Sequence, residues 1–151
     1  MRILVVEDNR RFSQALKEHI QKWGHVAEVL TTGREALQII RREQFDIAII
    51  DVFLPDCNGG RLVCEVKAHC PGAGVIIMTG SLSRELEFEI RKKWILGYFR
   101  KPFKARDLRL LLEDFSRKKS DHEDPKPSSP WMDQSVGRVI PMFKPASGPL
   151  N

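Results

Sequence analysis

The chain has 151 residues, of which 42% are hydrophobic and 30% are charged, with a formal net charge of +5. This length and composition predict one domain with a real hydrophobic core and room for a short appendage. A membrane-spanning protein is not expected, because no stretch approaches the roughly 20 apolar residues that a membrane helix needs. The modest positive charge does not indicate nucleic-acid binding either.

The cysteines and the first residues indicate where the protein works. Cys57, Cys64 and Cys70 form an odd set without a CxxC pair, which favours free thiols in a reducing compartment. The apolar run after Arg2 ends after four residues at two acids, so it is too short for a signal peptide. We therefore expect a soluble, cytoplasmic protein.

Apolar, mostly β-branched runs alternate with amphipathic stretches through residues 1–116. These runs predict strands at 2–6, 26–30, 46–50, 74–78 and 97–99, and helices at 10–22, 33–43, 59–69, 83–94 and 104–116. Five β-then-α units, with helices on both faces, predict an α/β fold with a doubly wound five-stranded parallel sheet and right-handed crossovers.

Three of the predicted helices begin at recognisable capping residues. Asn9 and Ser83 are typical N-caps for the helices that follow them. Thr32 and Glu35 have the spacing of a capping box.

The composition changes in the segment 117–151. It holds six of the nine prolines and has no helical or alternating period of any length. We expect a proline-rich tail outside the domain at 1–116, and a disordered tail is the favoured interpretation. Its apolar residues leave a docking peptide as the alternative, and they are Trp131, Met132, Val136, Val139, Ile140, Met142 and Phe143.

Acidic residues follow two of the predicted strands. Asp51 closes the apolar run 47–50, and Glu7 and Asp8 close the run 3–6. Because open α/β sheets place their sites at the carboxyl ends of the strands, we expect the three carboxylates to converge. Such a cluster repels itself unless it holds a cation, so the sequence indicates a divalent metal site.

Two further polar residues fall at predicted strand ends. Thr79 follows the apolar run 75–78, and Lys101 follows the run that ends at Arg100 and precedes Pro102. A hydroxyl and an ammonium group should therefore join the carboxylates at the same edge of the sheet.

Four short motifs each stand at the end of a predicted strand. They are Val5-Val6-Glu7-Asp8-Asn9, Asp51-Val52-Phe53-Leu54-Pro55 with Gly59, Met78-Thr79-Gly80, and Tyr98-Phe99-Arg100-Lys101-Pro102-Phe103. Each motif alone is weak, but together and in this order they make residues 1–116 resemble the receiver domain of two-component response regulators.

The resemblance implies a flavodoxin-like strand order of 2-1-3-4-5 and a phosphoacceptor at Asp51. It implies that Mg²⁺ is held by the carboxylates of Glu7, Asp8 and Asp51 and by the backbone carbonyl of Phe53. Phe53 is a bulky residue at its position, and we expect it to restrict water at the phosphoryl group and to lengthen the lifetime of the phosphorylated state.

The resemblance also implies that Thr79 and Lys101 bind the phosphoryl group, and that Thr79 and Tyr98 form a switch in which the ring rotates inward. The implied donor is a sensor histidine kinase or a histidine phosphotransfer protein. The switched face would bind a downstream protein that the sequence does not identify, and a phosphorylation-dependent homodimer is one form that this binding could take. No enzyme activity on outside substrates is expected, and neither membrane nor nucleic acid is an expected partner.

The segment after residue 116 is too short for a winged-helix or helix-turn-helix output domain, so we expect a stand-alone receiver. Trp94 and Ile95 stand where the family often has a small pair of residues. These large apolar groups either fill a deeper core or face a partner, and we favour the partner.

Three other functions are weighed against the receiver. An aspartyl-phosphate phosphohydrolase would carry a second aspartate at the position of Phe53. A flavin-binding protein would need Ser, Thr and Gly donors where Glu7 and Asp8 would repel a phosphate. The remaining alternative is a receiver-like scaffold that is never phosphorylated and acts through protein contacts.

Overall fold

The structure of the chain is a computed structural model, and it describes residues 1–81, 95–120 and 139–140. The strands are β1 (Arg2–Val6), β2 (Val26–Leu30), β3 (Ile47–Asp51), β4 (Gly74–Thr79), β5 (Gly97–Arg100) and β6 (Val139–Ile140). The helices are α1 (Arg10–Lys22), α2 (Gly33–Ile40), α3 (Gly59–His69) and α5 (Ala105–Ser120). The helix expected at 83–94 and its N-cap Ser83 lie outside the described residues.

The strands form one sheet in the order β2-β1-β3-β4-β5-β6. Its first five strands are all parallel, which confirms the doubly wound five-stranded sheet and the strand order 2-1-3-4-5. The sixth strand was not predicted, and it pairs antiparallel with β5. A two-residue strand carries too little alternation to be recognised from the sequence.

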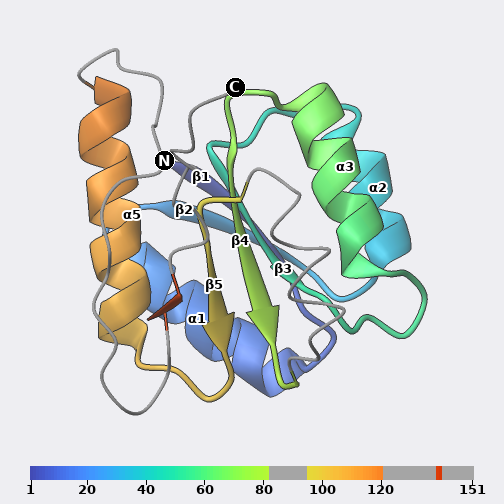
Figure 1. The fold of residues 1–151 in the computed structure, drawn as a ribbon, viewed down its shortest axis with the longest axis horizontal. Helices are drawn as coiled ribbons and strands as arrows, with labels where there is room; N and C mark the ends of the chain where they lie inside the picture. Colours follow the sequence, from blue (N-terminus) through green and yellow to red (C-terminus); the bar gives the residue numbers. More distant parts are fainter. Residues whose placement is uncertain (82–94, 121–138, 141–151) are drawn as a thin grey trace, which may run out of the picture.

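Two helix layers cover the sheet. Figure 1 shows α1 and α5 on one face and α2 and α3 on the other, and each pair closes its own hydrophobic cluster. Every residue of β3 and β4 is buried, as expected for parallel strands covered on both faces. None of the helices in the described ranges is long and apolar enough to cross a membrane.

The register of the sheet brings the strand ends together. Asp51, the last residue of β3, pairs with Met78, and Thr79, the last residue of β4, pairs with Arg100 at the end of β5. The strands β1 and β3 also run in parallel register. The residues that follow these strands therefore share the carboxyl edge of the sheet.

The predicted caps of the first two helices are present in part. Asn9 accepts a hydrogen bond from the backbone amide of Phe12 at 3.0 Å, as an N-cap does. The Thr32 hydroxyl accepts from the amide of Glu35 at 3.2 Å. It also donates to the Glu35 carboxylate at 2.8 Å, so only the threonine half of the capping box forms.

Helix α2 ends at Ile40, three residues before the predicted end. The backbone amides of Arg42 and Glu43 both donate to the carbonyl of Ile39, at 3.0 and 2.9 Å. Because two amides converge on one carbonyl, the regular ladder of helical hydrogen bonds stops there.

Helix α5 runs to Ser120, four residues beyond the predicted end at 116. Arg117 and Lys118 each form an ion pair with Asp114 one turn earlier, at 2.7 and 2.8 Å. Lys119 forms an ion pair with Asp46, the residue just before β3. These side-chain contacts extend the helix past the last apolar residue of its periodic pattern.

Candidate functional site

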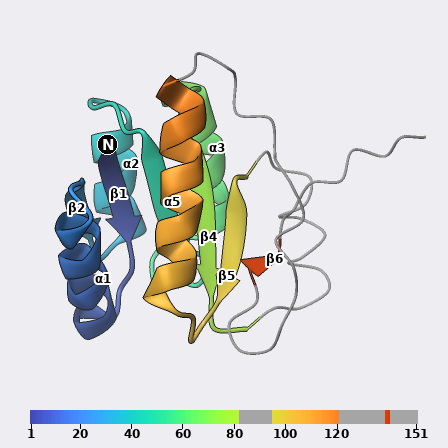
Figure 2. The same ribbon diagram turned by 90° about the vertical axis from the view of Figure 1, so that its left-hand side faces the viewer.

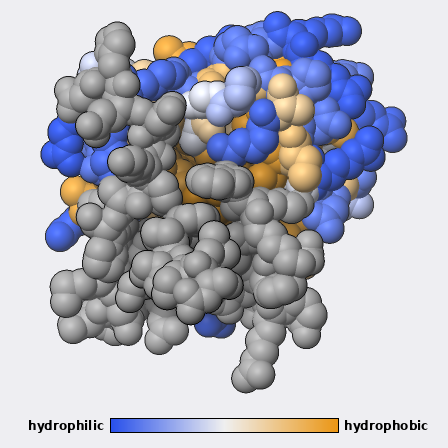
Figure 3. Space-filling view, turned by 45° about the horizontal axis from the view of Figure 1, so that its top comes forward, coloured by the Kyte–Doolittle hydropathy of each residue, from blue (hydrophilic) through white to orange (hydrophobic). Residues whose placement is uncertain are grey.

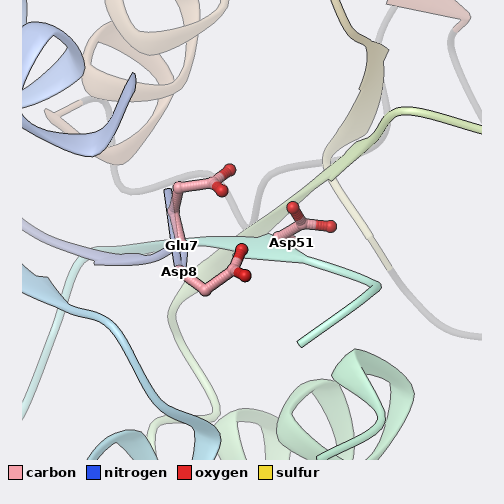
Figure 4. Close-up of side chains that lie close together, drawn as sticks. All are labelled: Glu7, Asp8 and Asp51. Atoms are coloured by element: carbon pink, nitrogen blue, oxygen red, sulfur yellow. The ribbon is translucent and has the colours of Figure 1, made fainter. Parts of the chain in front are cut away.

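Three carboxylates lie side by side at the carboxyl edge of the sheet (Figure 4). Glu7 and Asp8 follow β1, and Asp51 ends β3. One carboxylate oxygen from each residue lies within 4.8 Å of the others. Glu7 is 1% exposed and Asp51 5% exposed, whereas Asp8 is open to solvent. The structure therefore brings together the three acids that the sequence placed at strand ends.

Lys101 lies among these acids. Its Nζ donates to Asp51 Oδ2 at 2.6 Å and also contacts the Glu7 carboxylate. The same Nζ lies 4.9 Å from the centre of the Phe12 ring, within reach of a cation–π interaction. One ammonium among three carboxylates leaves an excess of negative charge at the site.

The surroundings shift the pKa values of both partners of this ion pair. Burial opposes the charge of Lys101, but the hydrogen bonds to Asp51 and Glu7 outweigh it and raise the pKa of Lys101. Burial raises the pKa of Glu7, against the hydrogen bonds from Lys101 and from the amide of Asn9. A bound cation would offset this cost of holding carboxylates together away from water.

The loop after β3 wraps around the acids. Asp51 Oδ1 accepts a hydrogen bond from the amide of Phe53 at 2.9 Å, and Phe53 forms an antiparallel bridge with Asn58. Residues 52–58 of this loop line a pocket together with Asp8. The Phe53 side chain is 57% exposed, so a large apolar group stands in solvent beside the acids.

Two polar residues that were not predicted hold this loop in place. The Asp56 carboxylate accepts hydrogen bonds at 2.9 Å from the amides of Gly33 and Arg34, at the start of α2. These bonds, that from Gly33 first, hold the pKa of Asp56 below its usual value. Asn58 caps α3 by accepting from the amide of Gly60 at 2.7 Å.

These two residues differ in how well the sequence could have revealed them. Asn58 stands directly before a predicted helix, which is a recognisable capping signal. The partners of Asp56 lie 22 and 23 residues away in the chain. No local pattern connects them.

Thr79 is fully buried at the end of β4. Its hydroxyl donates to the carbonyl of Ser81 and accepts from the amide of Ser81 at 3.2 Å. Its carbonyl accepts from the amide of Lys101 at 2.8 Å, and the peptide bond between Lys101 and Pro102 is cis. The backbone thus fixes Thr79 beside Lys101.

Tyr98 is 1% exposed and packs in the hydrophobic cluster on the α2 and α3 face. The ring is therefore buried in the state that the structure describes. Its rotation after phosphorylation stays a prediction.

Of the two large apolar residues before β5, Trp94 and Ile95, the structure describes only Ile95. Ile95 is 6% exposed and packs in the same cluster as Tyr98. The expectation that it faces a partner is wrong, because its side chain fills the core under α3. Trp94 lies outside the described residues.

The described surface is mainly hydrophilic. In the view of Figure 3, hydrophilic residues (blue) surround apolar ones (orange) on the face turned to the reader. Among the described residues, the exposed large hydrophobic side chains are Val26, Phe53 and Leu110. Of these, Phe53 is the one that lies in the loop beside the acids.

Comparison with known proteins relates this chain to a protein family. The response regulator receiver domain family matches residues 3–113. Transcriptional regulatory protein ZraR of Escherichia coli K12 is 33% identical over 111 residues, which are 74% of this chain and 25% of that protein. Transcriptional regulatory protein PhoP of Escherichia coli O157:H7 is 30% identical over 80% of this chain and 54% of its own length. The chain thus spans about a quarter to a half of these two relatives.

A solved structure agrees with the sequence comparisons. The CheY-like response regulator receiver domain protein of Methanospirillum hungatei JF-1 superposes with a TM-score of 0.74 at 29% identity, covering 80% of this chain and 97% of that one. Residues 3–113, which match the family, include the strand ends at which Glu7, Asp51, Thr79 and Lys101 lie. The chain belongs to the response regulator receiver domain family.

Proposed function

We propose that the chain is a phosphoacceptor of a two-component phosphorelay, with Asp51 as the residue that takes the phosphoryl group. The observation that carries the proposal is the position of the Asp51 carboxylate, 2.6 Å from Lys101 Nζ and within a group of three acids at the carboxyl edge of the sheet. The donor would be a sensor histidine kinase or a histidine phosphotransfer protein.

Transfer of the phosphoryl group to Asp51 requires only one bond to form and one to break. A carboxylate oxygen of Asp51 forms a bond to phosphorus while the bond from phosphorus to the histidine nitrogen breaks, and that nitrogen takes up a proton. The work of the site is to align the two groups and to balance the charge on the phosphoryl oxygens. Lys101, whose pKa is raised by Asp51 and Glu7, remains a cation for this purpose.

The three carboxylates suit Mg²⁺. They are hard oxygen ligands that can meet at one ion, and with Lys101 they carry two negative charges in excess, which a divalent ion balances. Glu7, Asp8 and Asp51 would hold the ion, with the carbonyl of Phe53 as a further ligand. The ion would supply neutralisation of the charge that develops during transfer.

The switch would run from Thr79 to Tyr98. The Thr79 hydroxyl now bonds to Ser81, and a phosphoryl group on Asp51 would offer it stronger acceptors. Movement of Thr79 would alter the packing near Tyr98 and so the surface at β5 and α5. A downstream protein, or a second copy of the chain, could respond only by binding the two states with different affinity.

The loop after β3 favours a signalling function over the turnover of substrates. The position two residues after Asp51 holds Phe53, which cannot act as the general acid of an aspartyl-phosphate hydrolase. We expect the chain to act with a histidine kinase in the cytoplasm. If it never accepts a phosphoryl group, the scaffold function takes its place.

Intact mass measurement tests the proposal. The full chain is incubated with acetyl phosphate in the presence and absence of Mg²⁺, next to the variants Asp51→Asn and Asp107→Asn. We expect the wild type and Asp107→Asn to gain the mass of one phosphoryl group in Mg²⁺, and Asp51→Asn to gain none. A wild type that gains no mass, or an Asp51→Asn protein that gains it equally, contradicts the proposal.

A further inference from the structure

The outer edge of β5 is occupied by the far end of the chain. On one side β5 pairs with β4, and on the other it pairs antiparallel with β6 (Figure 2). The register sets Tyr98 opposite Ile140 and Phe99 opposite Val139. An edge strand with open backbone groups is a template for a further strand, and here that strand comes from residues 139–140.

The sequence of this segment suits a short edge strand. Val139 and Ile140 are adjacent β-branched residues in a region otherwise rich in proline, and β-branched residues favour strands. Pro141 follows directly and has no backbone N–H to donate, so the pairing has a natural end at Ile140.

The segment between α5 and β6 is long enough for the chain to come back to the edge of β5. Helix α5 has 16 residues and carries the chain back along the sheet by about 24 Å. The segment 121–138 then precedes β6, and eighteen residues can span up to roughly 60 Å when extended. One chain can therefore close this contact without a second copy.

The paired residues of β5 lie next to the site. Tyr98 belongs to the core cluster under α2 and α3, and Phe99 to the cluster under α1 and α5. The Phe99 ring lies 4.8 Å from the Phe103 ring. Lys101, which contacts Asp51, follows directly after β5 in the sequence. A displacement of Lys101 would therefore act on backbone that leads directly into the strand paired with β6.

We propose that Val139–Ile140 is an intramolecular ligand of the β5 edge, which keeps other strands and partner proteins from that edge, and that phosphorylation of Asp51 changes its occupancy. The strand addition stands on the pairing alone. The dependence on phosphorylation rests on the proposed function. A strand from a second copy of the chain is the competing occupant, and the experiment separates the two.

Isotope-filtered NMR on the full chain identifies the occupant. Uniformly labelled protein gives cross-strand contacts between the backbone protons of residues 98 and 140 and of residues 99 and 139, and a mixture of labelled and unlabelled protein gives only those between chains. We expect the contacts within the labelled chain and none in the mixture. Contacts in the mixture would assign the edge to a second copy and overturn the proposal. Absence of the contacts from both samples would also overturn it, because no strand would then pair with this edge of β5.

Hydrogen exchange tests the pairing through a built-in control. Successive amides of a strand point to opposite sides, so alternate residues of β5 face β4 and β6. The variant Val139→Pro with Ile140→Pro removes both donors of β6, and Val136→Pro places proline outside the paired residues. We expect exchange of the β6-facing amides to rise about tenfold in the double variant only, with the β4-facing amides unchanged. Equal exchange in wild type and double variant contradicts the pairing.

The phosphorylation arm repeats the NMR measurement after addition of Mg²⁺ and acetyl phosphate. We expect the contacts between residues 99 and 139 to weaken or shift in the wild type and to stay constant in Asp51→Asn. If the intact mass rises and these contacts remain unchanged, the coupling is wrong, although the phosphoacceptor function stands. If the mass does not rise, it is the proposed function that fails, and the strand addition is still decided by the filtered contacts.

Discussion

Lys101 Nζ lies 2.6 Å from Asp51 Oδ2, although the two residues are 50 positions apart in the chain. The contact joins the end of β3 to the residue that follows β5, across β4. The same ammonium contacts Glu7 at the end of β1. A single cation therefore links the ends of β1, β3 and β5.

Replacement of Lys101 should slow phosphorylation. Lys101→Ala removes a preorganised cation from the place where phosphoryl charge develops, which typically costs on the order of 10²-fold in rate. The rate with acetyl phosphate and Mg²⁺ is followed by intact mass, with exposed Lys104→Ala as the matched control. A Lys101→Ala protein that reacts at the rate of the control would show that this ammonium is not needed.

Phe53 should protect the phosphorylated state. Its side chain is 57% exposed in the loop beside Asp51, where it can limit the approach of water. We expect Phe53→Asn to lose its phosphoryl group roughly fivefold faster, which corresponds to a barrier lower by about 1 kcal/mol. Phe53→Leu keeps an apolar group and should stay close to the wild type. Equal lifetimes for the asparagine and leucine variants would discard the shielding role.

Gly59 should tolerate no side chain. A Cβ built there would lie 2.6 Å from the carbonyl oxygen of Asp51, at the end of β3, and 2.7 Å from the Cα of Val52, at the start of the loop that follows. We expect Gly59→Ala to lower the free energy of unfolding by about 1–3 kcal/mol, as overpacking does. Gly72→Ala is the control, because its Cβ meets no atom within 4 Å. Urea unfolding that gives the two variants the same stability rules out this clash.

Asp56 should stabilise the loop by accepting from the first amides of α2. Asp56→Ala leaves both amides without this acceptor, so the free energy of unfolding should fall. Asp56→Asn keeps one carbonyl oxygen and should retain part of the stability. The free energies of unfolding are compared in urea, and an alanine variant as stable as the wild type would speak against the anchoring role.

The stability that Asp46 provides should depend on pH. Burial acts to raise the pKa of Asp46, but hydrogen bonds from Lys119 and from the amide of Arg2 outweigh it and hold the pKa below 3.8. A lowered pKa in the folded state means that the stabilisation is fully present above the unfolded value and is lost as the pH falls through the folded one.

The variant Asp46→Asn tests this dependence. Its free energy of unfolding should lie below that of the wild type between pH 5 and pH 7, and the difference should shrink below roughly pH 4. Urea unfolding at each pH measures it. A difference that stays constant down to pH 3 would mean that the Asp46 charge is not its source.

Most of the fold could be predicted from the sequence because the apolar strand segments and the amphipathic helix segments have clearly different patterns. β3 and β4 are buried on both faces, and such strands are continuous apolar runs that end sharply at Asp51 and Thr79. The convergence of the acids then follows from the parallel register, without knowledge of any contact. Site residues at strand ends are for this reason the predictable ones.

What the sequence could not reveal lies in contacts between distant segments. The bonds of Asp56 to α2 and the double contact of Lys101 depend on side chains meeting across the sheet edge. The pairing of Val139–Ile140 with β5 involves two residues, which is too short for a period to be visible. The burial of Ile95 depended on the depth of the core beside β5, which spacing along the chain does not encode.

Chemical trapping tests most directly whether Asp51 itself carries the phosphoryl group. Borohydride reduces an aspartyl phosphate to homoserine, so wild-type protein treated with acetyl phosphate and Mg²⁺, then reduced and fragmented for mass spectrometry, should contain homoserine at position 51. Protein that was not phosphorylated should keep aspartate there. Homoserine at another acid such as Asp8, or none in protein that has gained the mass of a phosphoryl group, would contradict the account.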